Sequence, residues 1–79
     1  MPTYLVKRDD GMWLMSYRLL GVMITDDEGG TAPVYSCVWG TQRNRARVFY
    51  QLWKAKSVTN GYRGITILMV DQNGEKPVE

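Results

Sequence analysis

The sequence predicts a small α+β domain: a mostly antiparallel sheet of three to five strands with one helix, at about residues 42–57, packed on one face. Two observations predict this class. Short β-branched and aromatic runs alternate with turn signals, and one longer segment carries apolar residues at helical spacing. A chain of 79 residues can bury only a thin core, so we expect a single domain over 1–79 with a flexible tail at 71–79.

The first expected strands form a hairpin. Residues 3–8, TYLVKR, alternate in character and precede the turn signal DDG. In the return strand, residues 12–25, bulky side chains occupy odd positions as far as Leu19 and even positions from Val22 onward. This change of parity predicts a β-bulge near Gly21, because one extra residue reverses the face that each side chain occupies.

The remaining elements follow a polar, glycine-rich connection at residues 25–33. Residues 34–39, VYSCVW, predict a strand, and Thr41 just beyond it has the hydroxyl expected of a helix N-cap. Residues 63–70, RGITILMV, are nearly all apolar and predict an interior strand.

The expected helix has a core-facing stripe and a basic ridge when its residues are placed 100° apart. The stripe consists of Ala46, Phe49, Tyr50, Trp53 and Ser57. Because we expect this stripe to be buried, Trp53→Ala should cost about 3–5 kcal/mol of folding stability. The ridge consists of Arg43, Arg47 and Lys54, which fall within about 40° of one another.

The helix also carries a second apolar patch, formed by Val48, Leu52 and Ala55. We interpret this patch either as a homodimer or partner contact or as packing against the 25–33 loop. The basic ridge is either a solvated surface neutralised by acids of the same chain or a docking surface for an anionic protein or nucleic acid. The candidate partner-binding residues are therefore Arg43, Arg47, Lys54, Val48 and Leu52.

The charge is distributed unevenly along the chain, although the net charge is only +2. Residues 1–28 hold three basic and five acidic side chains, and residues 71–79 hold one basic and three acidic ones. Residues 29–70 hold six basic side chains and no acidic one. Such asymmetry is informative about the partners of a protein rather than about its fold.

The composition gives little support to catalysis or metal binding. The chain has no His, the commonest general base and metal ligand, and its single Cys37 excludes an internal disulfide. We expect Cys37 to be a buried small hydrophobe, and we expect no enzyme activity, no cofactor and no metal site. The cysteine usage and the lack of a long apolar run favour a cytoplasmic protein without a membrane partner.

Residues 38–61 carry a resemblance to a known family. The strand ends in an aromatic residue and Gly-Thr, and a basic residue and an alanine follow; the residues concerned are Trp39, Gly40, Thr41, Arg43 or Arg45, and Ala46. This stretch resembles small phage and prophage proteins of the anti-CRISPR type. The resemblance implies a compact, non-enzymatic accessory protein, a monomer or homodimer in the host cytoplasm, that occludes a site on a host protein or ribonucleoprotein complex.

Two alternatives stay open beside that resemblance. A small nucleic-acid-binding or transcription-regulatory module would use the basic helix, with Trp39, Tyr50 and Tyr62 as possible stacking surfaces, although +2 is a low net charge for such a domain. The second alternative is a structural subunit that binds no ligand.

Overall fold

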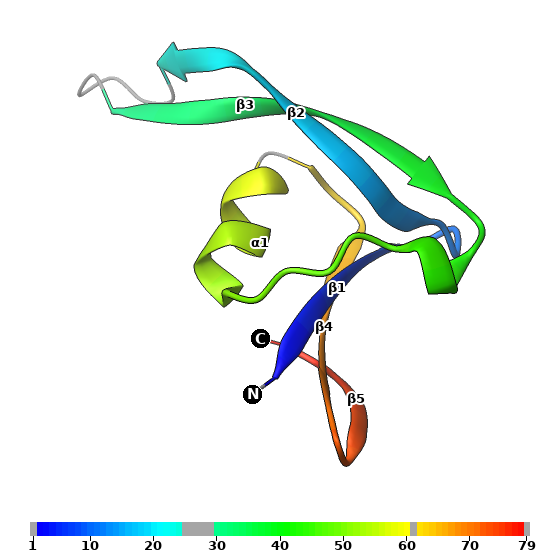
Figure 1. Cartoon of the computed structure of the whole chain (residues 1–79). Coiled ribbons are helices and arrows are strands. Elements are labelled where there is room, and N and C mark those ends of the chain that lie inside the picture. Colours follow the sequence, from blue (N-terminus) through cyan, green and yellow to red (C-terminus); the bar gives the residue numbers. More distant parts are fainter. Residues whose placement is uncertain (1, 25–29, 61, 79) are drawn as a thin grey trace.

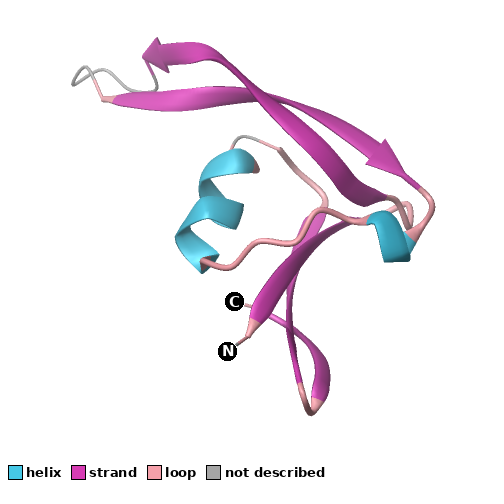
Figure 2. Cartoon of the chain, in the orientation of Figure 1, coloured by secondary structure: helices cyan, strands magenta, loops and turns pink. Residues whose placement is uncertain are grey.

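The structure is a computed structural model, and it describes residues 2–24, 30–60 and 62–78. These residues form one antiparallel five-stranded sheet and one α-helix, which confirms the predicted α+β class (Figures 1 and 2). The spatial order of the strands is β3-β2-β1-β4-β5. The elements are β1 (Thr3–Arg8), β2 (Trp13–Ile24), β3 (Thr31–Gly40), the 3₁₀ helix η1 (Arg43–Arg45), α1 (Leu52–Val58), β4 (Ile65–Asp71) and β5 (Gly74–Pro77).

The two long strands β2 and β3 form a twisted ribbon that turns away from the rest of the sheet. Figure 1 shows this ribbon arching over α1, with β1 and β4 on the other side of the helix. Register shifts interrupt the pairing between Leu14 and Ser16 and between Leu19 and Gly21. The second shift confirms the predicted bulge, and the first had no counterpart in the sequence pattern.

A short extended segment, residues 46–50, lies between β1 and β2. In the described part of the chain, those two strands pair at Lys7 and Trp13 alone. Phe49 instead exchanges backbone hydrogen bonds with Tyr4 of β1, at 2.8 and 2.9 Å, and the Arg47 amide donates to the Leu14 carbonyl of β2 at 2.8 Å. The segment thereby supplies partners for backbone groups that the divergence of the strands would otherwise leave unpaired.

A single core cluster joins α1, the extended segment and the sheet, and Leu5 and Trp13, 6% and 7% exposed, are buried outside this cluster. Helix α1 contributes Ala55 and Val58, and the extended segment contributes Phe49. The sheet strands contribute Val6, Leu14 and Ile67. Cys37 packs against this cluster but is only partly buried, whereas the sequence predicted a buried residue.

The predicted helix is wrong over its first ten residues. The α-helix begins at Leu52 rather than near residue 42, and residues 46–50 are extended because they pair with β1 and β2. Thr41 is not its N-cap; that position is Gln51, whose side chain makes no capping bond.

The predicted core stripe fails with the helix. Phe49 is buried, but Trp53 is 64% exposed and Tyr50 is 76% exposed. The predicted burial of Trp53 is therefore wrong, and so is the stability cost that it implied for Trp53→Ala.

The predicted loop at residues 25–33 and the predicted tail at residues 71–79 also differ from the structure. Strand β3 begins at Thr31, inside the predicted 25–33 connection, whose residues 25–29 lie outside the described ones. Where a flexible tail was expected over 71–79, β5 pairs antiparallel with β4, from Asp71 with Gly74 to Leu68 with Pro77.

Candidate partner-binding site

Three of the five candidate residues line one shallow hollow beside α1. Arg47 and Val48 come from the extended segment, and Lys54 comes from the helix. The hollow has a volume of about 210 Å³. Its other lining residues are Tyr17, Phe49, Tyr50 and Gln51.

The two cations of the hollow are held by aromatic rings. The Arg47 Cζ atom lies 5.3 Å from the centroid of the Tyr17 ring, and the Lys54 Nζ atom lies 5.7 Å from the same centroid. Lys54 Nζ also lies 5.3 Å from the Tyr35 ring centroid and donates a hydrogen bond to the Tyr35 hydroxyl at 3.3 Å. Cation–π attraction restrains both head groups, because the face of an aromatic ring carries negative electrostatic potential.

The ring that both cations share is itself fixed by its neighbours. Tyr17 stacks on Phe49 with a centroid separation of 5.5 Å and an interplanar angle of 19°. It meets Tyr35 edge to face, also at 5.5 Å. Such aromatic pairs contribute roughly 0.5–1.5 kcal/mol beyond their buried area. The core thus orients Tyr17, and Tyr17 in turn positions Arg47 and Lys54.

The other two candidate residues lie elsewhere. Arg43 sits in η1, with its Cζ atom 5.6 Å from the Trp13 ring centroid, and pairs with Glu75 of β5. Leu52 is partly buried and packs against the core. The structure therefore contains neither the three-residue basic ridge nor the separate apolar patch, in which Ala55 was expected to be exposed and is instead fully buried.

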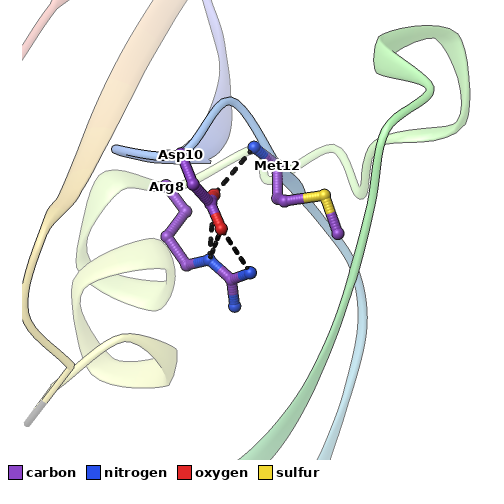
Figure 3. A network of polar contacts seen from close by, with 3 residues as sticks. All are labelled: Arg8, Asp10 and Met12. Atoms are coloured by element: carbon purple, nitrogen blue, oxygen red, sulfur yellow. Dashed lines mark hydrogen bonds and ion pairs between the residues drawn. The ribbon is translucent and has the colours of Figure 1, made fainter.

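Carboxylates neutralise some of the cations but not those of the hollow. Arg8 binds the Asp10 carboxylate through Nε at 3.0 Å and Nη2 at 2.7 Å, and the Met12 amide donates to the same carboxylate at 3.1 Å (Figure 3). The hydrogen bond from Arg8, followed by that from Met12, lowers the pKa of Asp10. Within residues 2–24, 30–60 and 62–78, no carboxylate pairs with Arg47 or Lys54. Their positive charge is uncompensated by the chain that the structure describes.

Sequence reasoning named Tyr50 as a possible stacking surface of a nucleic-acid-binding module, but its main prediction placed the aromatic residues of this surface in the core. Tyr50 lines the hollow and Trp53 lies one residue before Lys54, yet both were assigned to the core. The run Val48, Phe49 and Tyr50 has strong strand propensity, which is the one signal that could have indicated an extended segment.

The described residues show no other obvious chemistry. No group of three or more His, Cys, Asp or Glu side chains among them is placed to hold a metal ion. None of their helices has the length and apolar character needed to cross a membrane.

Comparison of the chain with protein-family models, with curated protein sequences and with solved structures finds no match.

Proposed function

We propose that this protein is a non-catalytic, phage-type accessory protein that binds a host protein or ribonucleoprotein complex through the hollow formed around Arg47 and Lys54. The setting that we propose is inhibition of a bacterial CRISPR-Cas system or a similar nucleic-acid-targeting defence. The observation that carries the proposal is a pair of cations, Arg47 and Lys54, that have no carboxylate partner among the described residues and line the same hollow as the exposed ring of Tyr50. Exposed Arg, Tyr and Trp side chains are the ones that contribute most to binding at interfaces.

The resemblance at residues 38–61 supports the same class of function. Strand β3 ends at Gly40, and a turn of 3₁₀ helix at Arg43–Arg45 follows it. The long helix that the resemblance requires is replaced by the extended segment, so the candidate contact is the hollow rather than a helical face.

The proposal can be tested by capture from a bacterial lysate combined with a plasmid-interference assay. The protein should retain a defence complex and restore transformation in a strain with an active CRISPR-Cas system, and the double variant Arg47→Glu, Lys54→Glu should lose both effects. Arg18→Glu, Lys76→Glu is the matched control, because both of its side chains are exposed and it changes the net charge equally. Circular dichroism would verify that both variants fold. Full activity of the first variant would refute the assigned site.

A further inference from the structure

We infer that the hollow binds single-stranded nucleic acid, with one backbone phosphate held by Arg47, a second held by Lys54, and a base stacked on the ring of Tyr50. This inference rests on the proposed function in one respect, since both assign the contact to the same surface. It goes further by naming the chemistry recognised there, which would be the exposed strand of a nucleic-acid-targeting complex.

The charge of the surface favours a polyanion as its occupant. Arg47 and Lys54 have no carboxylate partner among the described residues, and the whole stretch from residue 30 to residue 70 contains no acidic side chain. Protein interfaces that bind other proteins are generally depleted in Lys, whereas contacts to a phosphate backbone are made chiefly by Lys and Arg. The guanidinium of Arg47 lies against a ring, an arrangement that leaves its N–H edges available to phosphate oxygens.

The aromatic and polar rim favours a strand whose bases are accessible. The Tyr50 ring lines the hollow and is 76% exposed, so one apolar face is open for stacking. Gln51, beside it, carries an amide that can both donate to and accept from a base edge. Exposed rings beside basic side chains are the composition of surfaces that bind single strands.

Duplex DNA fits this surface less well. Reading the major groove requires a helix or a two-stranded ribbon that enters it. The β2–β3 ribbon contributes just Tyr17 to the lining of the hollow, so a duplex held by the ribbon would bind elsewhere. Helix α1 has seven residues, and its Ala55 and Val58 are buried in the core, so that side of the helix is occupied. The nucleic acid that suits a shallow hollow with one exposed ring is therefore single-stranded.

Fluorescence anisotropy with labelled oligothymidylate and oligouridylate of about 12 nucleotides would test the inference across a salt series. Two neutralised phosphates predict a slope of log K against log salt of about −1.4 or steeper. Arg47→Gln, Lys54→Gln should reduce the magnitude of the slope by about 1.4, whereas Arg18→Gln, Lys76→Gln should leave it unchanged. These two oligonucleotides differ in the 2′-hydroxyl and in the C5 methyl group of the base, so oligodeoxyuridylate, which lacks both, would show which group distinguishes DNA from RNA here.

Two variants at one position test the stacking part. Tyr50→Ala should weaken binding by about five- to a hundredfold, and Tyr50→Phe, which keeps the ring, should bind within about twofold of wild type. Equal affinity of Tyr50→Ala and wild type would overturn the inference. So would tighter binding to poly-glutamate than to either oligonucleotide, which would identify an acidic protein as the occupant.

Failure of this inference can be separated from failure of the proposed function. If neither oligonucleotide binds at low salt but the Arg47→Glu, Lys54→Glu variant still loses its captured complex, the single-strand inference is wrong and the proposed function stands. If neither oligonucleotide binds and capture does not depend on those two residues, both are wrong.

Discussion

Replacement of Phe49 by alanine should remove a large part of the domain's stability, whereas the same replacement of Trp53 should remove little. Phe49 is 3% exposed, belongs to the single core cluster and stacks on Tyr17. Trp53 is 64% exposed on the first turn of α1. The comparison discriminates sharply, because a continuous helix over residues 42–57 would bury both rings.

The expected magnitudes follow from these exposures. Truncating a buried Phe to Ala costs about 3–5 kcal/mol, from lost apolar burial together with the cavity left behind. A domain of 79 residues has a free energy of unfolding of roughly 4–12 kcal/mol, so Phe49→Ala removes a quarter of it or more. For the largely exposed Trp53 we expect a loss of about 1 kcal/mol or less. The backbone pairing of residue 49 with Tyr4 is retained in the alanine variant.

Urea denaturation followed by circular dichroism and by the fluorescence of Trp13 and Trp39 would measure both effects. With an m-value of about 1 kcal/mol/M, a loss of 3 kcal/mol lowers the unfolding midpoint by about 3 M. Trp53→Ala should shift the midpoint by about 1 M or less. Equal shifts for the two variants, or a larger shift for Trp53→Ala, would refute the extended conformation of residues 46–50.

Two further predictions concern the turns around β1. Gly64→Ala should destabilise the domain by about 1–2 kcal/mol or more, because Gly64 has a φ of +69° and an added Cβ would lie 3.0 Å from Asp9 Oδ2. Gly11→Ala should cost less, because Gly11 has a φ of +90° but an added Cβ there would have no neighbour within 4 Å. An equal cost in thermal denaturation would show that the Asp9 contact is unimportant. The lowered pKa of Asp10 means that its stabilising pairing with Arg8 is present above pH ~4 and is lost as the pH falls through the folded-state pKa. The melting temperature of Asp10→Asn should therefore vary less between about pH 4 and pH 2 than that of wild type, and parallel curves would contradict this.

The strands that the sequence predicts well are those specified by local patterns. Residues 3–8 form β1 with the predicted bounds, and the parity change near Gly21 corresponds to a register shift in the β2–β3 pairing. Strand β5 was missed although a turn signal is present at Asn73 and Gly74, because GEKP contains no apolar residue and pairs only along the edge of β4. Its existence depends on the neighbouring strand rather than on its own composition.

The helix prediction failed because residues 46–50 obey non-local constraints. Apolar residues at positions 46, 49, 50 and 53 have helical spacing, but a helix would leave the gap between β1 and β2 without backbone partners. The pairing with Tyr4 and Leu14 decides the conformation, and neither residue is near 46–50 in the sequence. Three arginines at 43, 45 and 47 also give the segment no charge pairing that would favour a helix.

Arg47 and Lys54 lie together for a reason different from the one that the sequence suggested. If both lay on one helix, their spacing of seven residues would place them on the same face. In the structure Arg47 lies in an extended segment and Lys54 in a helix, and both side chains contact the ring of Tyr17, which belongs to β2. No spacing rule could have named Tyr17, because its role depends on the β2–β3 ribbon arching over α1. Arg47 and Lys54 could be identified from their charge alone, but the Tyr17 ring that positions them could not.

The exposure of Tyr50 determines which experiments on the hollow are interpretable. Tyr50 is adjacent to Phe49, yet its ring lies largely outside the core, so Tyr50→Ala should unfold at nearly the wild-type urea concentration. A loss of oligonucleotide affinity in that variant is then a lost contact and not a lost fold. The same loss in Phe49→Ala would carry no such meaning, because that variant also loses the ring on which Tyr17 stacks, and Tyr17 contacts both cations. A Tyr50→Ala variant that unfolds as easily as Phe49→Ala would instead place Tyr50 in the core and remove the stacking surface on which the single-strand inference depends.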